Sequence, residues 1–259
     1  MPFTLTHTLA VLPIARMAWR RLPFSALIIG SMIPDLPMFF SQVFSYDEMH
    51  APLGLVRACL PAGLVVFLVF QWVMKEPLFA VLPKWIQARC PNRIRDRIRW
   101  SPSSIVGSAL AIVIGAATHQ VWDAFTHHGR WGTRLFPVLE QTVFSLGSYP
   151  VAGYKVVQYG SSLVGLPLLG ILLGVWLIQQ PVRSIEPGES LPNSWKWGIG
   201  LALVSSVIII VVMASQGTNF SAYQALGWGI RTWGRIMIVF TLAGCVVYQM
   251  KHSDFFKSP

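Results

Sequence analysis

The chain has 259 residues, of which 54% are hydrophobic and only 12% are charged, and its mean hydropathy is +0.55. This composition excludes an ordinary cytosolic enzyme and is typical of an integral membrane protein. Lys and Arg exceed the acidic residues by 20 to 10, for a formal charge of +10. Because the basic residues lie in short breaks between apolar runs, they indicate a membrane surface as partner and not nucleic acid. The three cysteines are widely spaced, which indicates neither a disulfide framework nor a thiolate metal site.

Six segments are apolar over about the 20 residues that a bilayer-spanning helix needs. In chain order they are residues 24–44, 53–74, 103–125, 158–180, 197–214 and 234–250. A shorter helix, 8–21, precedes them and is expected to be re-entrant or half-length. We therefore predict one all-α integral membrane domain over residues 1–259, a polytopic bundle of about six transmembrane helices. Residues 1–160 are expected to carry a metal site, and 161–259, with the small-residue pattern Gly170-x-x-x-Gly174, to serve as scaffold.

The segment 75–101 is strongly basic and is interleaved with apolar and aromatic residues. It is predicted to lie on anionic lipid at the cytoplasmic interface, although a merely solvated loop is the alternative. If this segment is cytoplasmic and successive spans cross the membrane in alternate directions, fourteen Lys and Arg lie on the cytoplasmic side and five on the outer side. By the positive-inside rule, both termini are expected on the cytoplasmic side of a bacterial inner membrane, and loops 45–52, 126–157 and 215–232 outside.

The motif T-H-Q-V-W-D-A-F-T-H-H at the end of the third span is the strongest chemical signal. His119, Asp123 and His127 recur every four residues and share a helix face, which continues backward through Gly115, Ala111 and Gly107. Imidazole and carboxylate groups at this spacing can hold a first-row divalent metal ion. The alternatives are that His119 and Asp123 bind each other between helices and that His127 is an ordinary histidine at the aqueous end of the span.

Asp35, in G-S-M-I-P-D-L-P, and His7 are expected at the same depth as His119. Helical rise puts Asp35 about 21 Å above Arg21 and His119 about 24 Å above Ser103. His7 reaches this layer if helix 8–21 is re-entrant, with Thr6 or Thr4 capping its start. Otherwise Asp35 only caps the turn after Pro34, and His7 is a surface residue near the terminus.

His50 and Arg57 are seven residues apart, which on a helix places them two turns apart on one face. His50 lies at the external mouth of the second span, in the same layer as the other donors, and is a further candidate metal ligand. The Arg57 guanidinium is expected either to clamp a phosphate or carboxylate beside the metal or to snorkel to the outer interface.

An ordered set of motifs resembles a known family. M-P-F-T-L-T-H-T, G-S-M-I-P-D-L-P, the loop with His50, T-H-Q-V-W-D-A-F-T-H and Y-K-V-V-Q-Y-G-S-S look like the bacterial domain-of-unknown-function 4184 family, over roughly residues 1–180. More remotely, their order is similar to that of inner-membrane proteins predicted to be metal-dependent hydrolases. This resemblance implies metal ligands at His7, Asp35, His50, His119 and Asp123. The chain has Leu36-Pro37 where those relatives carry a further acidic residue and a histidine, so a single metal is expected.

Three functions are compatible with these residues. The first is a hydrolase that uses a Zn, Mn or Fe ion to activate water against a lipid or lipid-linked phosphate or ester near the outer leaflet. In it, Asp35 and Arg57 are the candidate catalytic residues, for proton transfer and anion binding. The second is a proton or metal transporter with a His/Asp relay, which would string ionisable groups across the bilayer. The third is a non-catalytic scaffold with buried polar contacts.

Overall fold

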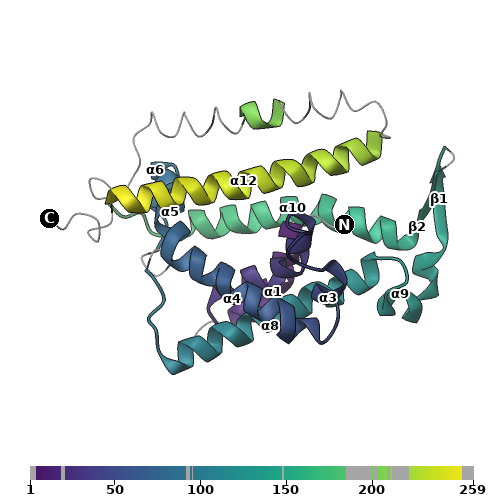
Figure 1. Cartoon of the computed structure of the whole chain (residues 1–259), viewed down its shortest axis with the longest axis horizontal. Coiled ribbons are helices and arrows are strands. Elements are labelled where there is room, and N and C mark those ends of the chain that lie inside the picture. The colour runs from purple at the N-terminus through teal and green to yellow at the C-terminus, as the bar shows by residue number, and fades with distance from the viewer. Residues whose placement is uncertain are drawn as a thin grey trace. The chain divides into compact units, whose positions relative to one another are not determined.

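A computed structural model describes residues 4–18, 21–91, 94, 96–147, 149–184, 200, 204–208, 211 and 222–252. The described chain is mainly helical (Figure 1), as the predicted all-α bundle requires. Four helical segments are long and apolar enough to cross a membrane, namely Leu55–Val81, Pro102–Thr126, Gly153–Ile178 and Gly227–Lys251. A shorter apolar helix covers Phe24–Met38. These segments indicate a membrane protein, but the count of six is not tested, since most of the predicted span 197–214 lies outside the described residues.

The chain divides into two compact units, each described here by itself. Unit 1 holds residues 1–37, 41–67 and 98–176, and unit 2 holds 38–40, 68–97 and 177–259. All the candidate site residues belong to unit 1. The division into a site half, 1–160, and a scaffold, 161–259, stays a prediction.

Unit 1 is built mainly from helices. Its elements are η1 (Thr4–His7), α1 (Thr8–Met17), α2 (Phe24–Met32), η2 (Ile33–Met38), α3 (Tyr46–Met49), η3 (Leu55–Cys59), α4 (Leu60–Val69), α8 (Pro102–Thr126), α9 (Trp131–Leu135), η5 (Pro137–Glu140), β1 (Thr142–Leu146), β2 (Tyr149–Ala152) and α10 (Gly153–Ile178). Its core gathers apolar side chains of α1, α2, α4 and α8, among them Val11, Leu27, Phe67 and Ile112.

Helix α8 is the central element of unit 1 and packs closely along α2. A capping box starts it: the Ser101 hydroxyl accepts from the Ser104 amide, the Ser104 hydroxyl accepts from the Ser101 amide, and Pro102 follows the cap. Further along, glycines bring the two backbones together. A Cβ at Gly115 would collide with the Leu27 carbonyl, and one at Gly30 with the Ile112 carbonyl.

Helix α2 ends where Pro34 enters the chain. Proline lacks an amide hydrogen and its ring clashes with the carbonyl four residues earlier, so an α-helix cannot continue unchanged. The chain tightens into the 3-10 turn η2, which also contains Pro37 and buries Asp35. The predicted break in the first span is therefore confirmed, and it places a carboxylate inside unit 1.

The connection between α8 and α10 contains more regular structure than the plain loop expected over 126–157. After α9 and η5, strands β1 and β2 pair antiparallel, with Ser145 opposite Pro150 and Leu146 opposite Tyr149. Gly147 adopts a φ of +61° in the turn, a conformation that glycine reaches without steric cost. Most side chains of this hairpin are exposed.

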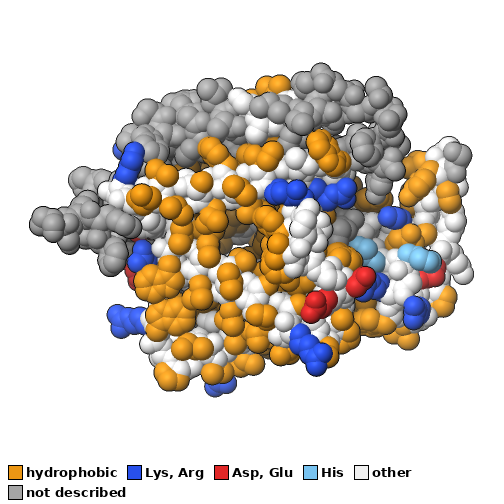
Figure 2. Space-filling model, in the orientation of Figure 1, with side chains coloured by type: hydrophobic (Ala, Val, Ile, Leu, Met, Phe, Trp, Pro, Cys, Tyr) orange, Lys and Arg blue, Asp and Glu red, His pale blue; other side chains and the backbone are white. Residues whose placement is uncertain are grey.

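Unit 2 contains η4 (Phe70–Met74), α5 (Lys75–Val81), α6 (Lys84–Gln87) and α12 (Ala222–His252). The helix predicted to end at residue 74 continues to Val81. Lys75 Nζ donates to the Asp96 carbonyl at 2.6 Å, and Arg97 pairs with Glu76 at 3.4 Å. α12 lies beside η4, where the Gln249 amide donates to the Val73 carbonyl. Hydrophobic side chains cover much of the face shown in Figure 2, as lipid contact requires.

Candidate metal centre

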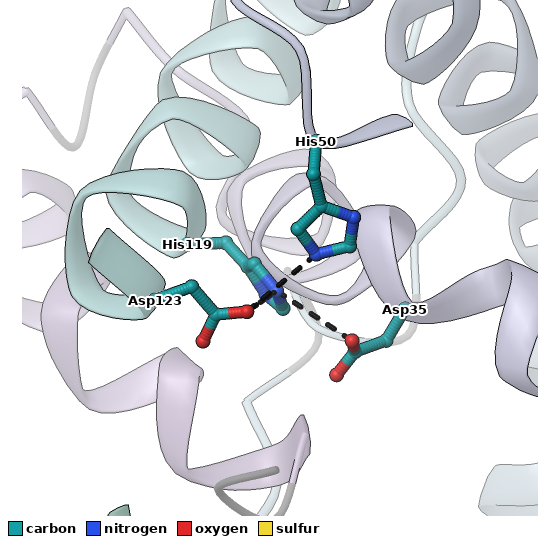
Figure 3. Close-up of side chains that lie close together, drawn as sticks. All are labelled: Asp35, His50, His119 and Asp123. Carbon is teal, nitrogen blue, oxygen red and sulfur yellow. Dashed lines mark ion pairs between the residues drawn. The ribbon is translucent and has the colours of Figure 1, made fainter. Parts of the chain in front are cut away.

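Four acidic and imidazole side chains gather inside unit 1 (Figure 3). Asp35 comes from η2, His50 follows α3, and His119 and Asp123 lie one turn apart on α8. One potential ligand atom of each lies within 4.8 Å of the other three, and all four residues are buried. Segments distant in the sequence thus meet at one point, as the estimate of equal depth predicts for Asp35 and His119.

The spacing of the four ligand atoms suits a tetrahedral metal ion. His119 Nε2 lies 3.4 Å from Asp123 Oδ2 and 3.6 Å from Asp35 Oδ1, and His50 Nε2 lies 3.5 Å from Asp123 Oδ2. Two ligands that each sit about 2.1 Å from a tetrahedral ion are about 3.4 Å apart. The cluster could therefore hold a metal ion with little movement of its side chains.

The same four atoms lack hydrogen-bond partners. Asp35 Oδ1, His50 Nε2, His119 Nε2 and Asp123 Oδ2 are buried and make no hydrogen bond in the described part of the chain. Ordinary polar contacts between helices would bring such atoms to about 2.7–3.2 Å. Leaving a buried polar atom without a hydrogen bond costs about 1–3 kcal/mol, and a metal ion at this point could satisfy all four atoms at once.

Both imidazoles of the cluster are held in the tautomer that a metal requires. His119 Nδ1 lies 2.8 Å from the Ser31 carbonyl and His50 Nδ1 lies 2.9 Å from the Tyr46 carbonyl. A carbonyl can only accept, so each Nδ1 carries the hydrogen and donates. The lone pair then resides on Nε2, the atom that faces the cluster, and the backbone fixes the ring orientation.

Three residues that the sequence did not assign to the site position its members. The Thr4 hydroxyl donates to Asp35 Oδ2 at 2.6 Å, and so does not cap helix α1 as expected. The Gln120 amide donates to the carbonyls of Met49 and Ala51, on either side of His50, and the Tyr46 ring stacks on the His50 ring. The position of Gln120, a polar residue inside an apolar span, could have marked it as part of the site. Its backbone partners could not be inferred from the sequence.

His7 lies beside the four-residue cluster. Its side chain is 1% exposed, so the alternative of a surface histidine is wrong. Its ring stacks on His119 with the centroids 3.8 Å apart, and Nε2 lies 3.6 Å from Asp123 Oδ1. Neither of its ring nitrogens has a hydrogen-bond partner among the described residues. His7 thus faces the carboxylate oxygen that does not point at the other ligands.

His127 occupies the edge of the cluster, with Nδ1 3.6 Å from Asp123 Oδ2. Nδ1 donates to the Asp123 carbonyl at 3.2 Å, and Nε2 lies 3.3 Å from Gln158 Nε2 of α10, which can donate to it. Burial lowers the pKa of His127, which favours this neutral tautomer. Its free lone pair is therefore directed at Gln158, and His127 is not one of the four mutually close groups.

The expected alignment of His50 with Arg57 is wrong. α3 ends at Met49, and the chain turns before η3 begins at Leu55, so the two residues do not share one helix. His50 is buried, whereas Arg57 is exposed. The seven-residue spacing carried no information here because it assumed an unbroken helix.

Two other cations contact residues of the site. The Arg130 guanidinium lies 5.9 Å from the centre of the Tyr46 ring, which itself stacks on His50. Lys155 Nζ lies 3.4 Å from Gln158 Oε1, and Gln158 contacts His127. Burial raises the pKa of the Tyr46 phenol, which stays neutral at physiological pH. Arg130 and Lys155 are therefore each one residue removed from a histidine of the site, His50 and His127 respectively.

Comparison with known proteins gives one match. No curated protein and no solved structure matches the chain, so the remote similarity to predicted hydrolases stays a prediction. The family model described as Domain of unknown function (DUF4184) matches residues 1–250. The match covers nearly the whole chain, and the protein therefore belongs to the DUF4184 family.

Proposed function

We propose that this protein is a membrane-bound hydrolase that depends on one divalent metal ion, Zn, Mn or Fe. The ligands would be Asp35, His50, His119 and Asp123. The observation that carries the proposal is the convergence of four buried, unpartnered ligand atoms, two of them Nε2 atoms freed by backbone bonds at Nδ1. Two imidazoles and two carboxylates form a mixed nitrogen and oxygen set that suits these ions.

When bound, such an ion supplies Lewis acidity to a phosphoryl or acyl oxygen and acidifies a water molecule. The chain's own residues provide proton transfer. His7 Nε2 faces Asp123 Oδ1 at 3.6 Å and has no other partner among the described residues, so it can accept a proton from the attacking water. His7 would then give this proton to the leaving oxygen as the P–O or C–O bond breaks.

The substrate class we propose is a lipid or lipid-linked phosphate or ester. The site lies among helices apolar enough for a membrane, and Arg130 and Lys155 border it with positive charge. Arg57, the anion clamp expected from the sequence, is exposed, so Arg130 and Lys155 are the better-supported candidates for that role. The proposal includes an outer-leaflet site in a bacterial inner membrane, with both termini cytoplasmic.

The basic segment 75–101 is proposed to contact anionic lipid. Trp85 and Trp100 are exposed, and Arg97 stacks over Trp72. Exposed indole rings beside basic side chains are typical of a membrane interface.

Metal analysis tests the function directly. The detergent-purified wild type is expected to hold about one transition-metal ion per chain, and a His119→Ala, Asp123→Ala double variant almost none. His128→Ala is the matched control, because this neighbouring histidine is exposed and outside the cluster; it should keep the wild-type content. Equal, near-zero content in the wild type and the double variant would remove the hydrolase proposal.

A further inference from the structure

An apolar groove of about 600 Å³ runs along α8 next to the metal cluster. This volume lies in the range of roughly 300–1,000 Å³ that is typical of ligand pockets. Its walls come from α8, from α1 and from the start of α10, and they are almost wholly apolar. The main apolar residues are Ala10, Ile114, Ala117, Val121, Phe125 and Val157.

The groove and the cluster share part of their walls. Trp122 lines the groove, and the edge of its ring contacts His7 with the ring centroids 6.4 Å apart. Thr126 also lines the groove, and its hydroxyl lies 3.4 Å from Asp123 Oδ1. A molecule lying in the groove would therefore be separated from the cluster only by the side chains of Trp122 and Thr126.

The length of the groove fits one leaflet of a bilayer. From Ile114 to Phe125, α8 rises about 17 Å at 1.5 Å per residue, and one leaflet contributes about 15 Å to the hydrocarbon core. Near the cluster, His127 contacts Gln158, and Gln158 contacts the Lys155 ammonium. The Arg130 guanidinium lies over the Tyr46 ring. An apolar groove whose wall residues contact His7 and Asp123, with two cations nearby, matches an amphiphile with a negative head.

We infer that this groove holds an acyl chain of an anionic phospholipid whose headgroup phosphate lies at the metal cluster. The inference rests on the proposed hydrolase function and narrows its substrate to a lipid with a charged head. The walls take the chain, because they are almost wholly apolar and burying a polar group against them would be costly. The positive charges of Lys155 and Arg130 favour a lipid whose headgroup is negatively charged.

Photolabelling tests the groove. The protein is placed in phosphatidylethanolamine nanodiscs that contain a phosphatidylglycerol with a diazirine on its acyl chain, and labelled residues are mapped after irradiation. Labelling is expected to concentrate at Ala117, Val121 and Phe125. A Val121→Trp variant, whose indole would fill the groove, should lose this labelling. Leu110→Trp is the matched control, since Leu110 and Val121 lie on the same helix and are 51% and 50% exposed, but Leu110 is outside the groove.

A diacylglycerol with the same labelled chain tests the role of the charged head. It should label the groove less than the phosphatidylglycerol does, and the difference should shrink in Lys155→Ala. Ala117→Phe replaces Val121→Trp if the latter does not fold. Labelling of the groove no stronger than that around Leu110, or equal labelling by both lipids, would overturn the inference.

Metal content measured on the same samples separates the two proposals. Val121→Trp with its metal retained and its labelling lost supports the groove. A wild type without metal would overturn the hydrolase proposal, while strong groove labelling in that sample would still support a lipid site.

Discussion

Two long helices of unit 1, α8 and α10, both carry small residues at helical spacing but use them differently. In α8, a Cβ at Gly115 would meet the Leu27 carbonyl and lie 2.7 Å from the Ser31 amide nitrogen of α2. In α10, a Cβ at Gly170 or Gly174 would meet nothing within 4 Å in the described part of the chain. Within those residues, the pattern Gly170-x-x-x-Gly174 therefore marks no close helix contact.

The difference teaches what makes a small-residue stripe informative. On α8, the face of Gly107, Ala111 and Gly115 continues into His119 and Asp123. The close approach to α2 lets the Ser31 carbonyl reach His119 Nδ1, so packing and ligand orientation come from the same contact. On α10, no metal-ligating group follows the two glycines. A small-residue pattern is therefore better evidence for a close helix contact at a functional site when polar residues continue the same helix face.

The largest expected effect comes from a glycine-to-alanine substitution on α8, compared with the same substitution on α10. Gly115→Ala should destabilise the protein by about 1–3 kcal/mol or more, because backbone atoms of α2 cannot move aside as a side chain could. It should also lower the metal content. Gly174→Ala should stabilise α10 by up to about 1 kcal/mol, since alanine favours helix. Thermal unfolding in detergent measures both, and equal melting temperatures for the two variants would contradict the comparison.

A second prediction concerns which neighbouring residues support the metal ligands. Thr4→Val keeps the side-chain shape but removes the hydroxyl that donates to Asp35 Oδ2. Loss of such a supporting bond typically weakens metal affinity about 10- to 100-fold. Thr4→Ser should retain affinity, because it keeps the donor. Gln158→Leu on α10 should change affinity less, since Gln158 contacts His127, which lies at the edge of the site and outside the four-residue cluster. A competition titration with a chelator measures all three, and a larger loss in Gln158→Leu would reverse the ranking.

Much of the fold was predictable because membrane helices leave a strong signal. The span predicted at 103–125 is Pro102–Thr126 in the structure. The second span, predicted over 53–74, extends to Val81 in the structure, past the charged pair Lys75 and Glu76. A lysine has a long apolar stem, and Lys75 instead reaches the Asp96 carbonyl from within the helix. The β-hairpin was missed because its strands are only five and four residues long.

The meeting of Asp35 with His119 and Asp123 was predictable from depth and helix face, whereas neither argument placed His50. Arithmetic on helical rise needs only unbroken helices, which holds well for α8. It fails between His50 and Arg57, where the chain turns. Thr4 and Gln120 were not assigned to the site because their partners are a side chain and backbone carbonyls brought near only by folding. Arg130 and Lys155 were likewise not assigned to the site, because the residues that they contact, Tyr46 and Gln158, come near the cluster only by folding.

The smallest expected effect lies in the connection between α8 and α10. Glu140 Oε1 accepts a hydrogen bond from the Gly129 amide at 2.9 Å, where Gly129 has a φ of +70°. This bond lowers the pKa of Glu140 below its usual 4.5. A lowered carboxyl pKa means that the bond contributes fully above about pH 4.5 and is lost as pH falls through the lower folded value. The ion pair with His128 adds little, because His128 is 72% exposed.

Glu140→Gln imitates the protonated acid at neutral pH. The Gly129 amide should exchange hydrogen faster in this variant than in the wild type at pH 7, and the difference should vanish at acid pH, where the wild-type carboxylate is neutral. Metal content at pH 7 should not change, because Glu140 lies outside the cluster. Equal exchange at pH 7 would mean that this bond does not order the connection. In that case, the position of α10 would depend on its other contacts, the His127–Gln158 contact and the packing of Gly165 against Thr6 and Leu9.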